Sequence, residues 1–445
     1  MTGSVVVLHP SKVTWINKLS TKSANFLDLV KDRFSLQYTL FDDHIIQDPF
    51  CLKASIRTLR QHGAAMVAST EEEIKLACDA AFHSCADGVT QVNLATALSP
   101  VLSRLLNHML VGKPLCRNER YMKNLAVQRE YIMPLGMLLA CFPGILRRPL
   151  GRVMKSYVSS IARGCMADLK PYYQHIIDYV GQDTRRLSAE LENTYLRHYL
   201  DIARSMPNHD RAVQLDVITS MAVQLGSAAF NELEAAIPSL MADVLQAGTH
   251  SNLMQLLLKE IIPVTSLGFA ELSAALWSAD RLPILDSCVR ETLRMHSMQL
   301  LSMQRKILKN TCVDDGSQLS EGTSICVSAY SIHRDHTFYT QPDSYDPFRF
   351  YKPTTDAVVA TLAAVSYEAD EHYLAFGYGN HICPGRRVAT SVLKLVFIHL
   401  FSNYDIQLVD KEPRTRSIAI LKWHWTDVKV RMSRRETVFT PRSSA

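Results

Sequence analysis

The sequence has no CxxC pair and no cysteine cluster of the kind that frames a disulfide scaffold or a structural zinc site. Its ten cysteines are scattered along 445 residues, most of them among apolar neighbours. Free thiols buried in a core have this distribution. The pattern favours a reducing compartment rather than a disulfide framework.

The sequence also lacks a run of the roughly 18 apolar residues that a membrane-spanning helix needs, and no signal peptide opens the chain. The longest candidate, Tyr131 to Phe142, ends at Pro143-Gly144 and is followed by Arg147-Arg148. A segment of this length is typical of a core helix or of a helix resting on a membrane surface. Peripheral membrane contact is therefore an open alternative to burial.

Strong charge, internal repeats and long Pro/Gly/Ser linkers are absent as well. The net charge is +5 and no basic run is interleaved with aromatic residues, so the chain does not indicate a nucleic-acid partner. The absence of repeats argues against a solenoid. Hydrophobic residues make up 47% of the chain and charged residues 20%, which allows a large core.

Apolar residues at three- and four-residue spacing predict mainly helices before residue 296. After it, we expect a strand, an ordered loop rich in proline, a buried helix and a tail with strand character. The expected helices are Glu71 to Phe82, Met154 to Leu169, Asp183 to Met206, Ala212 to Ala247 and Arg386 to Ser402. The expected strand is Ser324 to Tyr330, the loop is Tyr339 to Pro353, and the tail is Asp405 to Phe439.

One short segment concentrates unusual chemistry, the run from Phe376 to Arg387 (FGYGNHICPGRR). Two glycines, Gly377 and Gly379, permit tight turns before Cys383. A helix is expected to begin directly after Pro384-Gly385, which places Cys383 at a helix N-terminus. There the helix dipole and free N–H groups favour a thiolate, the ligand form of cysteine.

The pattern Phe-x-x-Gly-x-His-x-Cys-x-Gly resembles the haem-binding loop of the cytochrome P450 family. Phe376, Gly379, His381, Cys383 and Gly385 fill its five positions. The resemblance implies a mainly α fold with a minor β portion, a haem b cofactor, and Cys383 as the axial thiolate ligand of its iron.

Two further segments match the family in the same order along the chain. The first, Leu282 to His296 (LPILDSCVRETLRMH), carries Glu291 and Arg294 on one helical face. The second, Tyr345 to Phe350 (YDPFRF), carries Arg349. By resemblance, Glu291, Arg294 and Arg349 form a buried network behind the haem loop, and their role is structural support.

The resemblance extends over most of the chain from about residue 50, including Ile325 to Asp335, Leu257 to Ile261 and, as in fungal members, Val111 to Glu119. It implies one domain over residues 1–445. It also implies haem propionate contacts from Arg305 and His381, with Arg57 or Arg60 as a third candidate. The family's hydrophobic N-terminal anchor and early strand are expected to be missing.

The helix over the open face of the haem normally carries an acid or histidine followed by threonine. Counting back from Leu257 to Ile261 places that segment at Asn231 to Ala236, with Glu234 at the acid position and Ala235 and Ala236 replacing the hydroxyl residues. Ala247 to Ser251 is the rival segment. An incomplete proton relay follows from the preferred register.

These observations predict a haem-thiolate monooxygenase that oxidises an apolar small molecule, by resemblance a fungal secondary metabolite such as a terpenoid. An NADPH-dependent flavoprotein reductase would supply electrons and dock on a basic face near Arg386, Arg387 and Lys394. The alternatives are haem-dependent rearrangement, cyclisation or dehydration, and a truncated non-catalytic haem protein. The family implies the cytoplasmic face of the endoplasmic reticulum; a soluble cytoplasmic form is the alternative.

Overall fold

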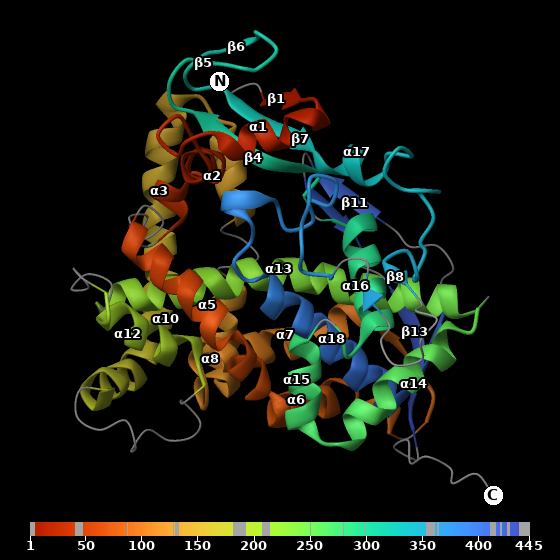
Figure 1. Cartoon of the computed structure of the whole chain (residues 1–445). Coiled ribbons are helices and arrows are strands. Elements are labelled where there is room, and N and C mark those ends of the chain that lie inside the picture. The colour runs from red at the N-terminus through yellow and green to blue at the C-terminus, as the bar shows by residue number, and fades with distance from the viewer. Residues whose placement is uncertain are drawn as a thin grey trace, which may run out of the picture.

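In the computed structural model the chain is built mainly from helices, with small sheets beside them (Figure 1). This is the mainly α architecture with a minor β portion that the sequence predicted. The single domain over residues 1–445 stays a prediction. The structure describes residues 5–40, 48–86, 88–127, 129, 133–180, 193–206, 214–249, 251–278, 280–297, 299–352, 361–362, 365–409, 415–418, 421–424 and 428–435.

The helices account for most of the described residues. They are α1 (Val13–Lys18), α2 (Phe26–Arg33), α3 (Leu36–Thr39), α5 (Pro49–Ala68), α6 (Glu71–Ala81), α7 (Leu94–Val111), α8 (Glu119–Val127), α9 (Met133–Ala140), α10 (Gly144–Val180), α12 (Tyr195–Arg204), α13 (Leu215–Gly248), α14 (Leu253–Ser266), α15 (Phe269–Trp277), α16 (Pro283–Met295), α17 (Ala329–His333) and α18 (Arg386–Asn403).

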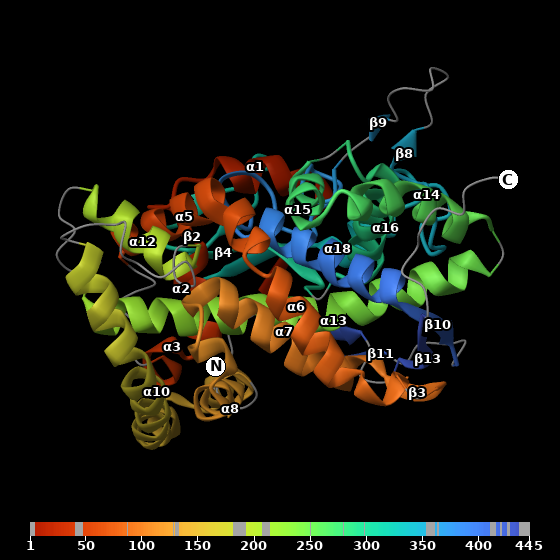
Figure 2. The ribbon, with the colours of Figure 1, turned by 90° about the horizontal axis from the view of Figure 1, so that it is seen from below.

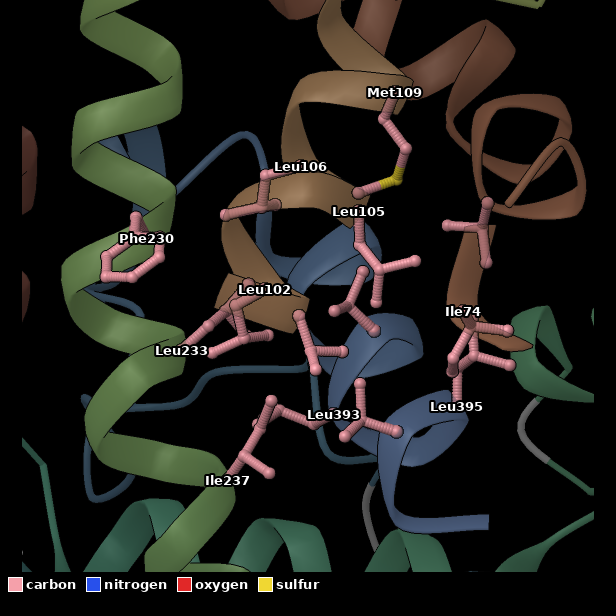
Figure 3. Close-up of a cluster of buried hydrophobic side chains, with 14 of the residues drawn as sticks. Ile74, Leu102, Leu105, Leu106, Met109, Phe230, Leu233, Ile237, Leu393 and Leu395 are labelled. Atoms are coloured by element: carbon pink, nitrogen blue, oxygen red, sulfur yellow. The ribbon is translucent and has the colours of Figure 1, made fainter. Parts of the chain in front are cut away.

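The core forms where the long helices α7, α13 and α18 meet. Apolar residues recur on the facing sides of these helices, and burying each large aliphatic side chain contributes roughly 1.5–3 kcal/mol. Figure 3 shows the buried side chains of this contact: Phe230, Leu233 and Ile237 of α13, Leu102, Leu105, Leu106 and Met109 of α7, Leu393 and Leu395 of α18, and Ile74 of α6.

The larger sheet has the strand order β1-β7-β4-β2, with β1 (Val5–Leu8) parallel to β7 (Ser324–Ser328). Strands β4 (Leu301–Ile307) and β2 (Ala24–Asn25) complete it through antiparallel pairs. The expectation of a missing early strand is therefore wrong. The β-branched run Val5-Val6-Val7 favours an extended chain, and β7 supplies a partner that local sequence does not reveal.

A second sheet joins the tail to the first hundred residues in the order β10-β13-β3. It contains β10 (Tyr404–Leu408), β13 (Lys429–Arg434) and β3 (Thr90–Asn93), which lie together beside the N-terminal end of α7 (Figure 2). Short hairpins are formed by β5 (Thr311–Cys312) with β6 (Gln318–Leu319), β8 (Tyr351–Lys352) with β9 (Thr361–Leu362), and β11 (Thr415–Ile418) with β12 (Leu421–His424).

Most predicted elements are present with shifted ends. The predicted helix at 71–82 is α6, the one at 154–169 lies inside α10, and those at 212–247 and 386–402 are α13 and α18. Of the helix predicted at 183–206, residues 183–192 lie outside the described residues, and within the remainder α12 spans Tyr195–Arg204. The strand ends at Ser328 rather than Tyr330, because the Ser328 hydroxyl accepts the Ser331 N–H at 3.1 Å and caps α17.

Among the described residues, α7 has the length and apolar composition that a membrane span needs. More than half of it, 56%, is buried inside the protein, where it packs against α6 and α13. A buried core helix passes the same compositional test as a membrane span.

Candidate metal centre

Cys383 lies at the end of a tight loop that leads into α18. The loop contains a one-turn helix, Gly379–His381, and both Gly377 (φ +70°) and Gly379 (φ +69°) adopt the left-handed conformation that favours glycine. The Cys383 N–H donates to the Phe376 carbonyl oxygen at 2.8 Å and closes the loop. This geometry accounts for the two glycines in the motif.

The N-terminal helix α1 holds the loop from outside. Asn17 Oδ1 accepts the Asn380 N–H at 2.9 Å, and a Cβ added at Gly379 would lie 1.9 Å from that same oxygen. Gly379 is thus required both by its backbone conformation and by the close approach of Asn17. The local motif alone did not indicate this contact.

The Cys383 sulfur is enclosed by protein but keeps N–H donors of its own chain. Burial raises the pKa of the Cys383 thiol, while the backbone N–H groups of Gly385 and Arg386 and the Arg386 charge oppose that rise. The N–H groups at the start of α18 lower the pKa of Cys383, as expected, but burial raises it by more. A metal cation bound to the sulfur removes this cost, because coordination deprotonates a thiol.

Arg305 of β4 lies close to His381 of the loop, which precedes Cys383 by two residues. Burial lowers the pKa of Arg305 to about 10, and among the described residues its Nη2 is a buried nitrogen with no hydrogen-bond partner. Burial also lowers the pKa of His381 to about 4, with a contribution from the Arg305 charge. A buried cation with an unused donor suits an anionic group of a ligand.

Glu291, Arg294 and Arg349 meet in one buried ion-pair network, as the sequence predicted for their contacts. Arg294 Nε donates to Glu291 Oε2 at 2.8 Å, and Arg349 Nε donates to Glu291 Oε1 at 2.9 Å. Glu291 and Arg294 are fully buried, and Arg349 also donates to the Thr340 carbonyl at 2.6 Å. Every charge in the network therefore has a partner of opposite sign or a carbonyl acceptor.

His333 connects this network to the cysteine loop. Its Nδ1 bonds the Arg294 carbonyl oxygen at 3.1 Å, its carbonyl oxygen accepts from Arg294 Nη1, and its Nε2 accepts the Leu374 N–H at 2.8 Å. Gly377 N–H in turn donates to Leu374 O at 3.0 Å. Burial lowers the pKa of His333 to about 3, so the ring is neutral and can accept at Nε2.

Arg290, next to Glu291, was missed from the sequence. It is only 1% exposed, and its guanidinium lies over the rings of Phe350 (4.8 Å) and Tyr373 (3.7 Å) and donates to the carbonyls of Val365 and Glu368. The one indication in the sequence was that Arg290 lies in the same helical segment as Glu291, for which burial was predicted. The contacts of Arg290 hold the stretch of chain that leads into the cysteine loop.

A basic docking face was expected near Arg386, Arg387 and Lys394. For Lys394 this prediction is wrong. This lysine is fully buried and its Nζ bonds Asp286 Oδ1 at 3.0 Å. Arg386 is directed inward to the Cys383 carbonyl at 2.9 Å, and Arg387 lies over the Trp277 ring at 4.6 Å. Helical position alone did not distinguish these inward charges from surface charges.

The distal-helix segment Asn231 to Ala236 lies in the middle of α13. Ala235 is buried and Glu234 is half-buried. The rival segment, Ala247 to Ser251, lies at the C-terminal end of the helix, where Thr249 and Ser251 are exposed and their hydroxyls bond the carbonyls of Gln246 and Ala247. The role of Glu234 stays a prediction.

A second group of potential metal ligands lies far from the cysteine loop in sequence. Atoms of Glu73, His108 and Cys116 come within 4.8 Å of one another, all buried. However, Glu73 already accepts from Arg104 at 2.5 Å and from Arg117, and Lys113 Nζ lies 3.8 Å away. Three positive charges around one carboxylate disfavour a metal cation there.

A family model for "Cytochrome P450" matches residues 251–423, the part of the chain that contains the buried network and the cysteine loop. Together with the helical fold and the cysteine loop, this match supports the chain as a member of the cytochrome P450 family.

Relatives of similar sequence are themselves cytochrome P450 monooxygenases. The chain is 24% identical to efuH of Hormonema carpetanum over 78% of this chain and 62% of that protein. It is 25% identical to monooxygenase 71 of Postia placenta (92% and 79%) and to ecdH of Aspergillus rugulosus (94% and 79%). The chain thus spans less than two thirds of the first relative's length.

The family's cofactor is haem with an axial cysteine thiolate, and the residues described above fit it. Cys383 offers a sulfur with N–H donors, and Arg305 offers a buried cation with an unused nitrogen beside His381. These observations are what an iron ligand and a partner for haem carboxylates require.

Proposed function

We propose that the protein is a haem-thiolate monooxygenase that inserts oxygen into a lipophilic small molecule. The observation that carries the proposal is the Cys383 loop, held by α1 on one side and by the Glu291 network through His333 on the other. Haem bound there supplies dioxygen activation favoured by thiolate donation. The chain's own residues bind the iron through Cys383, pair haem carboxylates with Arg305 and His381, and hold the loop in place.

For the substrate we propose a fungal secondary metabolite such as a terpenoid. The support is the likeness of Val111 to Glu119 to fungal members and the fungal origin of the similar monooxygenases. Fold alone does not define the substrate, so this part rests on similarity.

For the electron donor we propose an NADPH-dependent flavoprotein reductase. Its docking face is better placed on α5 than at Lys394. Lys53, Arg57 and Arg60 are exposed there at intervals of four and three residues, which lines them along one side of the helix. Arg60 also lies close enough to Arg386 to influence its pKa. An acidic partner on this stripe would sit near the cysteine side of the site.

The proposal is tested by supplying the purified haem protein with NADPH, a microsomal reductase and labelled dioxygen, and screening a panel of terpenoid hydrocarbons and alcohols. We expect products that contain one labelled oxygen atom and form only when NADPH and reductase are both present. Isomerised or dehydrated products that form equally without NADPH would contradict it.

That second outcome would support haem-dependent rearrangement instead. The feature in its favour is the pair Ala235 and Ala236, which in the predicted register takes the place of the hydroxyl residues of the family's usual proton relay. An intact buried network and a well-formed cysteine loop count against the third possibility, a chain that no longer binds haem.

We further propose that the protein lies against a membrane through α9 and the start of α10. Large apolar side chains are exposed there, among them Leu138 (56%), Ile145 (87%) and Val153 (72%). Arg148 and Arg152 are exposed beside them. Apolar side chains next to arginines suit insertion into the head-group region of an anionic bilayer.

Replacing Leu138, Ile145 and Val153 together by serine is expected to weaken binding to phosphatidylserine-containing vesicles at least roughly tenfold, since each buried apolar side chain contributes about 1.5–3 kcal/mol. Sedimentation with vesicles measures the change. A matched control replaces Val89 (72% exposed, outside this segment) by serine and should bind normally. Equal binding of the triple variant and the parent would contradict the proposed contact.

A further inference from the structure

Helix α16 carries two buried carboxylates on different sides. Glu291 belongs to the ion-pair network with Arg294 and Arg349. Asp286 lies five residues earlier, and five residues rotate the helix by about 140°. Asp286 is therefore turned away from that network, although its side chain is only 1% exposed. A second buried acid outside the Glu291 network needs partners of its own.

Three donors from two other parts of the chain meet at Asp286. Lys394 Nζ of α18 donates to Asp286 Oδ1 at 3.0 Å. The Ser366 hydroxyl donates to the same oxygen at 2.7 Å, and the Ser366 N–H donates to Asp286 Oδ2 at 2.6 Å. Lys394 and Ser366 are both fully buried. A single carboxylate thus joins α16, α18 and the segment 365–374, which leads into the cysteine loop.

The end of α16 that carries Asp286 is itself held in place. Glu260 of α14 accepts the Ile284 N–H at 2.7 Å with one carboxylate oxygen and the Leu285 N–H at 2.9 Å with the other. Both N–H groups belong to the first turn of α16, where no partner exists within the helix. Asp286 lies in the same turn, so Lys394 binds to a fixed point.

Lys394 belongs to the helix that begins directly after the cysteine loop. Arg386, the first residue of α18, donates from Nη1 to the Cys383 carbonyl at 2.9 Å. The Ala389 N–H donates to the Gly385 carbonyl at 2.9 Å, which continues the helical bonding back to the loop. Lys394 lies eight residues after Arg386, about 12 Å along the helix axis. A slide or rotation of α18 against α16 therefore moves the cysteine as well.

We propose that Lys394 and Asp286 are positioning residues that fix α18, and with it the sulfur of Cys383, relative to the rest of the site. The inference rests on the proposed haem-thiolate function, in which this sulfur ligates iron. The Glu291 network reaches the start of the cysteine loop through His333. The Asp286 contact reaches the end of the loop through α18. Helix α16 thus holds both ends of the loop with separate carboxylates.

A pair of substitutions separates this positioning from stability. Lys394→Met alone leaves a buried carboxylate without its cation, which is strongly destabilising. Asp286→Asn combined with Lys394→Met removes both charges together, and the asparagine oxygen can still accept from Ser366. Replacing both members of a buried ion pair often preserves stability, so we expect this double variant to fold and to bind haem. It lacks only the bond between α16 and α18.

The experiment follows the carbon monoxide complex of the dithionite-reduced haem protein in guanidinium below the unfolding transition. We expect the double variant to lose the far red-shifted Soret band roughly tenfold faster than the parent, because no charge-assisted hydrogen bond opposes displacement of α18. Its thermal unfolding midpoint should stay within a few degrees of the parent's. Its iron reduction potential should differ from the parent's, since the donor strength of the sulfur depends on its surroundings.

Two further variants complete the comparison. Asp286→Asn combined with Lys394→Gln places two amides that can remake a hydrogen bond between the helices, and should restore most of the lifetime of the band. Lys259→Met removes an exposed lysine from α14 and should behave as the parent does. If the methionine double variant does not accumulate, Asp286→Asn alone weakens the same bond and should also shorten the lifetime of the band.

The inference is overturned if the double variant, or Asp286→Asn in its place, keeps the band as long as the parent. It is also overturned if the glutamine variant loses the band as fast as the methionine variant. A loss of the band that only follows a lowered unfolding midpoint would show a structural role and no positioning. A parent protein without the red-shifted band would instead overturn the proposed function on which the inference rests.

Discussion

Replacing Glu291 by alanine is expected to prevent accumulation of folded, haem-loaded protein. Glu291 is fully buried and is the carboxylate shared by Arg294 and Arg349. Removing it leaves buried guanidinium groups without their anion, which costs roughly 3–5 kcal/mol. Because a folded domain is stable by only about 5–15 kcal/mol, the loss is a large fraction of the total. Urea unfolding and haem content per chain measure it.

A matched control is Glu271→Ala, which breaks the ion pair with Arg281. Both partners of that pair are about two-fifths exposed, at 38% and 40%. A surface pair of this kind contributes roughly 0–1 kcal/mol, so the control should fold and load with haem normally. A Glu291→Ala protein as stable as the Glu271→Ala protein would show that the buried network does not hold the site together.

Replacing Cys383 by serine is expected to abolish NADPH-dependent product formation while leaving the protein folded. The loop is closed by the main-chain bond from Cys383 N–H to Phe376 O, which serine keeps. The side chain is the part that changes, from a sulfur ligand to an oxygen that donates far less electron density to iron. Product formation is measured by turnover with NADPH and reductase. Folding is measured by far-ultraviolet circular dichroism.

The contrary result would be a folded Cys383→Ser protein that still produces oxygenated product at the parent's rate. It would mean that the iron is held by another group. The other cysteines offer little competition, because most of those that the structure describes are buried away from the loop, and burial raises the pKa of Cys116, for example, to about 12.

The cysteine loop and the contacts of the buried network could be predicted from the sequence. In the loop, glycines, cysteine and helix start follow one another within a dozen residues, so local geometry decides the outcome. Glu291 and Arg349 are farther apart in the sequence, and their spacing alone does not predict that they pair. The resemblance to a family supplied that prediction. Functional roles at both places stay proposals.

Other parts of the site could not be predicted because they depend on tertiary contacts. Lys394 lies in a helix whose apolar residues cover most of its circumference, but nothing local shows that Asp286 of α16 will meet it. Likewise, Asn17 reaches Gly379 and Asn380 from the other end of the chain. Distant partners of this kind decide which charged and amide side chains point inward. The spacing of apolar residues in the surrounding sequence does not show it.

The orientation of α13 shows the same limit within a single helix. A gapless count located the segment Asn231 to Ala236, and the acid at its expected position was Glu234. Whether Glu232 or Glu234 lies beside the packed face of the helix depends on the packing of Phe230 against α7 and of Asp243 against α16. Sequence spacing fixes the angle between the two acids but not the rotation of the helix as a whole.

The proposed function depends on Cys383 as the thiolate ligand of a haem iron. The most direct measurement is the carbon monoxide difference spectrum of the purified, dithionite-reduced protein, recorded beside Cys383→Ala. We expect a far red-shifted Soret band in the parent protein that is absent from the variant. A folded parent protein with no haem signal, or with the same band in Cys383→Ala, would contradict it.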